Sequence, residues 1–134
     1  MRIVIDTNVF IIALIGKSSP KLIEWLSDKR FTILFSKESY SELIEVIRRP
    51  KFEKLFTEQR VFTLLDLLDS IKIMVLTKSK TEICRDKKDN FLLNLAKDGE
   101  ADYLITEDFD LLALGTHFET KIVNYNQFIK EVIL

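Results

Sequence analysis

Glycine and proline are scarce in this sequence, which contains 3 Gly and 2 Pro among its 134 residues. A P-loop or a dinucleotide-binding turn needs clustered glycines, because glycine lets the backbone approach a phosphate closely. Gly16, Gly99 and Gly115 lie far apart in the chain. The distribution of glycine therefore excludes both kinds of glycine-rich nucleotide site.

Cysteine and histidine are scarcer still. Cys84 is the single cysteine, so the chain forms no internal disulfide, and His117 is the single histidine. The usual zinc sites need several Cys or His side chains and are therefore absent. A metal site built by this chain must use the carboxylate oxygens of Asp and Glu.

Long apolar runs are missing too. No stretch is long enough to span a bilayer, and Asp6 and Asn8 interrupt the apolar residues 1–15, so we expect neither a membrane segment nor a signal peptide. These features predict a cytoplasmic protein. The net charge is −1, which does not by itself indicate a nucleic-acid-binding protein.

Strand and helix patterns alternate along the chain, whose length suits one domain over residues 1–134. Apolar, largely β-branched runs predict strands over residues 2–5, 31–35, 71–76, 103–106 and 121–123. Helical spacing and capping residues predict helices over 8–14, after Ser19–Pro20, from Ser36 to Pro50, after Thr57, from Asp89 to Gly99, and around Phe128. The alternation favours an α/β fold with a parallel sheet and helices on both faces.

Four acidic residues fall near one expected edge of this sheet. Asp6 directly follows the first strand, and Asp108 comes two residues after the fourth. Glu42 lies in the first turns of the helix after the second strand, and Asp89 opens the helix that precedes the fourth. Right-handed crossovers place the carboxyl ends of parallel strands at one edge, where ligands bind. We therefore expect acids from distant parts of the chain to meet there.

Gathering four carboxylates is unfavourable unless a cation joins them. Like charges a few ångströms apart raise each other's pKa, and burial adds to this effect. Mg²⁺ or Mn²⁺ relieves the repulsion, because these hard divalent cations bind oxygen ligands. Such a site assists the attack of water on a phosphodiester, and the reaction needs no Ser, Cys or His nucleophile.

Each acid also has a purely structural interpretation. The three aspartates stand where a helix N-cap is common. Glu42 lies off the apolar stripe of its helix, where a solvated acid is ordinary, and Glu38 and Glu45 are rival candidates on that helix. Taken one by one these alternatives stay open, and only the joint placement of four acids at one edge favours a site.

Four segments of the sequence resemble motifs of the PIN-domain nucleases. They are Ile3–Asn8, which contains a strand-end Asp-Thr-Asn motif, then Ser41–Phe52, Cys84–Asn90 and Ala101–Leu112. The second segment is similar to a VapC-like branch of toxins from toxin–antitoxin pairs. The resemblance covers nearly the whole chain and implies a three-layer α/β/α sandwich with a mostly parallel central sheet.

The resemblance also implies a set of functional residues. The catalytic and metal-binding acids are Asp6, Glu42, Asp89 and Asp108, with Asp110 as an outer ligand and Thr7, Asn8 and Thr106 as polar supports. It further implies dependence on Mg²⁺ or Mn²⁺, an RNA substrate, homodimers or higher homo-oligomers, and a small antitoxin protein that masks the site. Two positions depart from the pattern without removing a ligand: Glu107 stands where relatives often have a glycine or small polar residue, and Lys87 where they often have proline.

Basic residues concentrate in two segments. The first contains Arg48, Arg49, Lys51 and Lys54, and the second contains Lys78, Lys80, Arg85, Lys87 and Lys88 and leads directly to Asp89. Such residues hold phosphates without reading sequence. We expect RNA contacts from Arg48, Arg49, Arg85, Lys87 and Lys88, while ordinary solvated lysines remain the alternative. Phe62 and Leu67 widen the apolar face of their helix, which fits either a subunit contact or deep packing.

The sequence favours a metal-dependent endoribonuclease over four other functions. A catalytically inactive PIN-like module that binds RNA or protein would not need all four acids. A phosphatase of the haloacid-dehalogenase type has a second Asp where this chain has Asn8. A receiver domain would have paired acids near its start and an acceptor Asp at the end of a later strand. A flap-type DNA nuclease would need additional elements to thread DNA.

Overall fold

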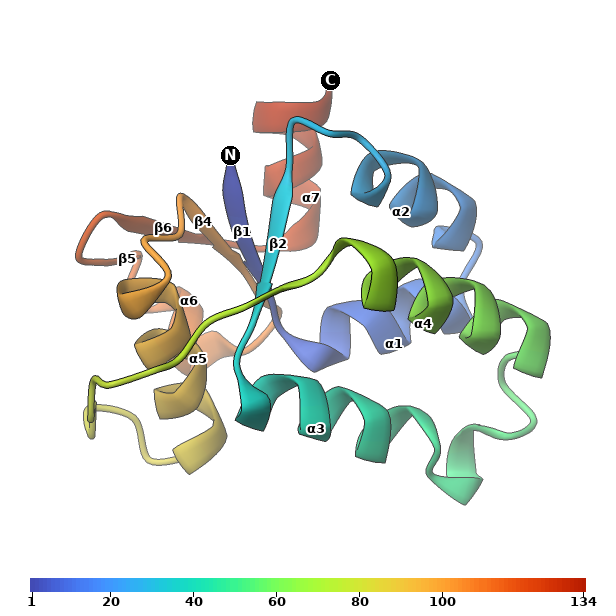
Figure 1. Cartoon of the computed structure of the whole chain (residues 1–134), viewed down its shortest axis with the longest axis horizontal. Coiled ribbons are helices and arrows are strands. Elements are labelled where there is room, and N and C mark those ends of the chain that lie inside the picture. The colour runs from blue at the N-terminus through green and yellow to red at the C-terminus, as the bar shows by residue number, and fades with distance from the viewer.

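A six-stranded sheet forms the centre of the molecule in the computed structural model, which describes residues 1–134 (Figure 1). The strands are β1 (Arg2–Ile5), β2 (Thr32–Phe35), β3 (Ile73–Met74), β4 (Tyr103–Ile105), β5 (Thr116–His117) and β6 (Thr120–Val123). They lie in the order β3-β2-β1-β4-β6-β5 and are parallel except for β5, which pairs antiparallel with β6. The crossovers make β1 and β4 direct neighbours, although they are far apart in sequence.

Helices cover both faces of the sheet. They are α1 (Thr7–Ile15), α2 (Ser19–Leu26), α3 (Lys37–Ile47), α4 (Glu58–Ile71), α5 (Lys87–Asp98), α6 (Phe109–Leu112) and α7 (Tyr125–Phe128), with a 3₁₀ turn η1 (Pro50–Phe52) and a π-helical turn η2 (Ile129–Ile133). Figure 1 shows α1, α2 and α4 to the right of β1 and β2, α3 below these strands, and α5 with α6 on their left, below β4 to β6. No helix is both long enough and apolar enough to cross a membrane.

Alternation along the strands divides the core into two layers. Ile3, Ile5, Ile33, Phe35, Ile105 and Val123 pack in the larger cluster with residues of α1 to α4 and α7. Val4, Leu34, Leu104 and Ile122 pack in the smaller cluster with residues of α5 and α6. Successive strand residues thus face opposite helix layers, as the two-residue period of a strand requires. The expected three-layer α/β/α sandwich is confirmed.

Polar residues fix the starts of the helices that the sequence predicted after Ser36 and Thr57. The Ser36 side chain accepts a hydrogen bond from the Ser39 amide at 3.2 Å, and the Ser39 hydroxyl oxygen accepts one from the Ser36 amide at 2.9 Å, which forms a capping box. The Thr57 hydroxyl accepts from the Arg60 amide at 3.2 Å. Each cap satisfies an amide that the first turn of the helix leaves without a backbone partner.

The expected strand over residues 71–76 was wrong in its extent. Only Ile73–Met74 form β3, because Ile71 is the last residue of α4. The apolar stripe of that helix, which includes the buried Leu64 and Leu68, continues to Ile71 at helical spacing. One further hydrogen bond, from the Val75 amide to the Phe35 carbonyl at 2.8 Å, extends the contact of this segment with β2.

The start of α5 was also predicted two residues too late. The helix begins at Lys87, because the Asp86 side chain caps it by accepting from the Lys88 amide at 2.9 Å. Asp89 therefore lies inside the first turn of α5 and is not its cap. The short strand β5, at one edge of the sheet, was not predicted at all.

Candidate metal centre

The junction of β1 and β4 brings two of the predicted acids together. The Asp6 amide donates to the Ile105 carbonyl at 2.9 Å, so the chain leaves both strands at one edge of the sheet. The Thr106 hydroxyl donates to Asp6 Oδ2 at 2.8 Å and accepts from the Asp108 amide at 3.0 Å. Thr106, which is fully buried, therefore joins the two aspartates through one oxygen atom.

Asp6 and Asp108 differ in the capping hydrogen bonds that their side chains make to the helices that follow them. Asp6 occupies the N-cap position of α1, but its side chain accepts no capping hydrogen bond. Asp108 does cap α6, because its Oδ1 accepts from the amides of Asp110 at 2.8 Å and Leu111 at 3.3 Å. The Asn8 amide in the first turn of α1 still lowers the pKa of the Asp6 carboxyl, so this helix start stabilises the Asp6 charge. For Asp108 the structural interpretation is correct and compatible with a second role, because both capping bonds use the same oxygen.

Asp89 completes the cluster from the first turn of α5. Its side chain is only 5% exposed, and its Oδ2 has no hydrogen-bond partner. One carboxylate oxygen from each of Asp89, Asp108 and Asp110 lies within 4.8 Å of the other two. A buried carboxylate oxygen without a partner is costly unless a cation or a proton joins it. This oxygen donor set fits a hard divalent cation.

Burial and the repulsion between neighbouring carboxylates raise the pKa values of Asp6 and Asp89. Burial raises the pKa of Asp6 to about 6, against the lowering effect of the Thr106 hydrogen bond, and the charges of Glu42 and Asp108 raise it further. Burial also raises the pKa of Asp89 to about 7, and Asp108 is the neighbouring acid that adds most to this effect. The acids therefore lie within electrostatic reach of each other, which is the condition that a shared cation would relieve.

Glu42 turns toward this cluster from α3. Its Oε1 lies 3.6 Å from Lys88 Nζ at the start of α5, and its side chain is 20% exposed. Because its charge raises the pKa of Asp6, Glu42 belongs to the same electrostatic environment. The rival candidates Glu38 and Glu45 are both exposed. The helical pattern did not select Glu42, because such a pattern indicates only which face of one helix is apolar. It contains no information about the approach of α5.

The supporting residues differ in their surroundings. Thr7 is buried beside Asp6, whereas Asn8 is exposed. Asp110, expected as an outer ligand, is one of the three acids with the closest oxygens, and it also pairs with Arg85 at 3.2 Å. Phe109, which sequence reasoning missed, lies between Asp108 and Asp110 in the sequence and is 87% exposed. Its place between two acids of the cluster is the sequence signal that could have singled it out.

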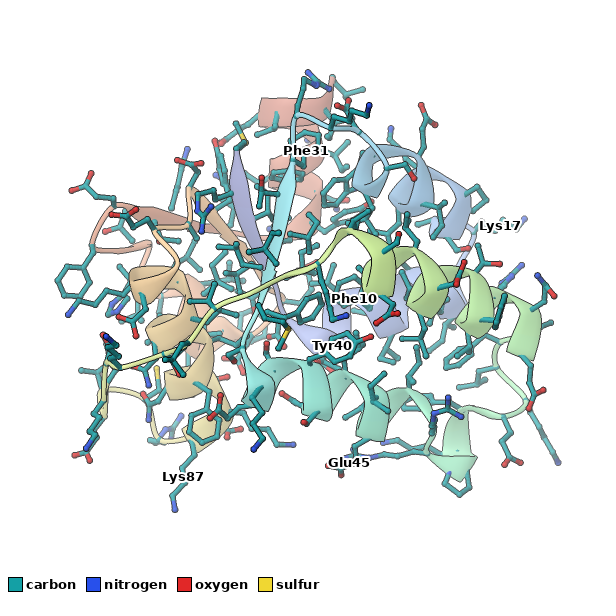
Figure 2. All side chains as sticks on the ribbon, in the orientation of Figure 1. Phe10, Lys17, Phe31, Tyr40, Glu45 and Lys87 are labelled. Carbon is teal, nitrogen blue, oxygen red and sulfur yellow. The ribbon has the colours of Figure 1, made fainter.

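The predicted basic residues separate into two groups. Arg85 and Lys88 contact acids of the cluster, and Lys87 is exposed at the first position of α5, where its side chain points away from the molecule (Figure 2). Arg48 and Arg49 follow the C-terminal end of α3 and line a different groove, beside η1 and α4. Arg49 pairs there with Glu45 at 3.2 Å. The structure thus brings the residues before Asp89 to the acids and leaves the pair after α3 elsewhere.

Comparisons with known proteins agree with this fold. A family model described as PIN domain matches residues 2–110, which includes the four predicted acids. The uncharacterized protein MJ1680 of Methanocaldococcus jannaschii is 31% identical over 142 aligned residues, which cover 98% of this chain and 91% of the relative. PIN domains are typically metal-dependent nucleases. On the extent of the family match and of the similarity to this relative, the chain belongs to the PIN-domain family.

Proposed function

We propose that this protein is an endoribonuclease that depends on Mg²⁺ or Mn²⁺ and hydrolyses RNA phosphodiester bonds. The observation that carries the proposal is the buried Asp89 carboxylate, which has an unpartnered oxygen and lies beside Asp108 and Asp110. A structural acid in this position would be paired with a donor. The family membership of the chain supports the same chemistry.

Asp89 and Asp108 would hold the cation together with Asp6, and Glu42 and Asp110 would complete the acidic surroundings. When bound, the cation supplies Lewis-acid chemistry, which offsets the charge that develops on the phosphate and favours the ionisation of water. Thr106 holds the Asp6 carboxylate in one orientation through its hydrogen bond of 2.8 Å.

Arg85 and Lys88 would meet the substrate phosphate. The side chains of Arg85 and Lys88 are 90% and 52% exposed, respectively. Exposed ion pairs contribute little free energy, so both cations can leave their carboxylate partners at small cost. Phe109 offers an exposed ring beside the acids, on which an unpaired base can stack.

The cleavage assay uses labelled RNA with the purified full-length protein and Mn²⁺. We expect cleavage that EDTA abolishes and that Asp6→Asn reduces by at least about 100-fold, since removal of a group that stabilises the transition state has effects of this size. Asp66→Asn, which alters an exposed acid on α4, is the matched control and should retain full activity. Equal activity of Asp6→Asn and the wild type would contradict the proposal.

We further propose that the protein is the toxin of a toxin–antitoxin pair and acts as a homodimer. The resemblance of Ser41–Phe52 to the toxin branch supports the first part. Phe62, which is 65% exposed in the groove between η1 and α4, supports the second. A short neighbouring reading frame whose product co-purifies with the chain and suppresses cleavage would support an antitoxin. Sedimentation of the wild type and Phe62→Ala measures the dimer, and a monomeric wild type would contradict it.

A further inference from the structure

The connection between β3 and α5 contains no helix or strand, yet a polar stripe on α5 holds it in place. The stripe consists of Asn90, Asn94 and Asp98, which are spaced by four residues and therefore share one face of the helix. Asp98 accepts from the amides of Lys78 and Ser79 at 2.6 and 2.8 Å. The stripe satisfies backbone donors that no sheet partner reaches.

The other two members of the stripe hold the remainder of the connection. Asn94 Oδ1 accepts from the Thr81 amide at 2.9 Å. Asn90 accepts from the Cys84 amide at 2.9 Å and donates to the Cys84 carbonyl at 3.0 Å. Asn90 and Asn94 are both 8% exposed, so these bonds are shielded from water. Residues 78–84 are therefore held in one conformation along the helix.

Exposure alternates along this connection. Thr77, Ser79 and Thr81 are half-buried against α5, and their neighbours Lys78, Lys80 and Glu82 are exposed. A backbone fixed in this way presents Lys78 and Lys80 on the same side of the chain. Their positions are set in advance, so a ligand that binds them does not have to order the backbone.

These lysines line a groove that Arg85 links to the acidic cluster. The groove has a volume of about 590 Å³, and its wall includes Lys78, Lys80, Arg85 and Lys87 together with the ring of Phe91. Phe91 is 41% exposed although it lies on the otherwise well packed α5. Arg85 lines the groove and also pairs with Asp110 at 3.2 Å, so its side chain links the groove to the cluster. Glu38 and Glu82 also line the groove, and the four cations outnumber them.

We propose that this groove binds a single strand of RNA on its way to the carboxylates, an inference that rests on the proposed nuclease function. Lys78, Lys80 and Lys87 contact successive phosphates, and a base stacks on the ring of Phe91. An unpaired base is needed for this contact, because the faces of bases in a duplex are already stacked. The ring favours a polynucleotide over an acidic peptide, which would use the lysines alone.

Binding is measured by fluorescence anisotropy in EDTA, with a labelled single-stranded 12-mer oligouridylate and the full chain. EDTA prevents metal-dependent cleavage and separates binding from catalysis. Lys78→Ala/Lys80→Ala should flatten the dependence of log affinity on log salt by about 1.4, because each phosphate contact with a single strand contributes about 0.7. Phe91→Ala should weaken binding by at least about fivefold, the low end of stacking contributions.

Matched controls keep the same chemistry outside the groove. Lys17→Ala/Lys21→Ala removes two exposed lysines near α2 and should leave the salt dependence unchanged. Phe118→Ala removes an exposed ring in the turn between β5 and β6, outside the groove, and should leave the affinity unchanged. All substituted side chains are at least partly exposed, and thermal unfolding confirms that each variant is folded.

Three results would overturn the groove assignment: groove variants that bind like the wild type, equal binding of a duplex of the same length, or preferential binding of polyglutamate. None of these three results tests the nuclease proposal, because RNA cleavage with Mn²⁺ is measured in a separate assay. Conversely, a protein that binds the 12-mer through the groove but shows no cleavage with Mn²⁺ would contradict the nuclease proposal and support the groove.

Discussion

Asp89 shows how burial governs chemistry at the scale of a single residue. Its carboxylate is enclosed by the first turn of α5 and faces other acids without a hydrogen-bond donor for Oδ2. The helical spacing of Asp89 and Leu92 predicted that this acid faces the packed side of its helix, but not that one of its oxygens lacks a hydrogen-bond partner, because that depends on how other elements approach. Asp6 was better predicted, since a residue at the end of a buried strand has few alternatives to the sheet edge.

The first prediction concerns the pH dependence of stability without metal. Burial and neighbouring acids raise the pKa of Asp89 to about 7 in the folded chain, above its ordinary value of 3.8. A raised carboxyl pKa contributes stability below the unfolded value, and this stability is lost as the pH rises through the folded value. Asn mimics the protonated carboxyl, so Asp89→Asn should be more stable than the wild type at pH 8 by roughly 2–4 kcal/mol.

Urea unfolding in EDTA at several pH values measures this difference. The gap between Asp89→Asn and the wild type should shrink as the pH falls from about 8 to about 4, where the ordinary carboxyl titrates. Asp66→Asn, at an exposed position, should show no such trend. A constant gap between Asp89→Asn and the wild type across the pH range would contradict the assigned burial.

The second prediction concerns the hydroxyl that joins two acids. Thr106→Val keeps the shape of a fully buried side chain but removes the donor to Asp6 and the acceptor for the Asp108 amide. We expect a loss of about 1–3 kcal/mol, typical of buried groups left without partners, together with a lower rate of RNA cleavage. Denaturant unfolding and the cleavage assay provide the two measurements.

Thr120→Val is the matched control for Thr106→Val. Thr120 is also buried and donates to the Ala101 carbonyl at 2.7 Å, but it lies on β6 away from the acids. This variant should lose comparable stability and keep its specific activity. Equal effects of the two substitutions on activity would show that Thr106 acts only in folding.

At the scale of elements, α5 contacts both the sheet and the connection from β3. Its apolar residues pack on the sheet, its first turn supplies Asp89, and its polar stripe holds the connection from β3. The sequence predicted the apolar face by its spacing. It did not predict that β3 is confined to Ile73–Met74, because β-branched residues such as Ile71 and Val75 suit a strand. Ile71 instead ends α4, and Val75 makes a single backbone bond to β2.

The third prediction tests this polar stripe. Hydrogen bonds from Ser79 and the Lys78 amide lower the pKa of Asp98, although burial alone would raise it. A lowered carboxyl pKa contributes stability above the unfolded value, and this contribution is lost as the pH falls through the folded value. Asp98→Ala should therefore destabilise the chain by about 1–3 kcal/mol at pH 7 and by less near pH 3. The contribution of Asp98 to stability thus changes with pH in the direction opposite to that of Asp89.

Unfolding of Asp98→Ala at the two pH values checks the third prediction. The exposed Asp102 is unsuitable as a control, because its Oδ2 accepts from the Arg2 amide at 2.8 Å. The exposed Asp66 offers a cleaner comparison, and Asp66→Ala should change little at either pH. A loss that stays the same at acidic pH would mean that the Asp98 charge is not what holds the connection.

At the scale of the whole molecule, the fourth prediction is that a divalent cation stabilises the fold. A ligand that binds only the folded state adds free energy that grows with its concentration, about 2.7 kcal/mol at 100 times Kd. Mn²⁺ should therefore raise the melting temperature of the wild type and raise that of Asp89→Asn much less. Differential scanning calorimetry with and without Mn²⁺ gives the comparison, and equal shifts in both proteins would place the cation elsewhere.

The fold class was the feature that the sequence predicted most fully. Alternating strands and helices require a sheet with two helix layers, and that requirement holds even though β3 was too long and β5 was absent from the prediction. The strand order was less accessible, because no local pattern states that β1 and β4 are neighbours. Glu42 illustrates the same limit, since only the packing of α3 against α5 turns it toward Asp6.

The pairing of β1 with β4 has a consequence for synthesis on the ribosome. Asp6 is translated early, whereas Thr106 and Asp108 follow about a hundred residues later. Until those residues emerge, a nascent chain holds Asp6, Glu42 and Asp89 without Asp108, Asp110 or the hydroxyl that positions Asp6. The acidic cluster can therefore assemble only after Asp110 has emerged, and the proposed nuclease should remain inert toward its own messenger until then.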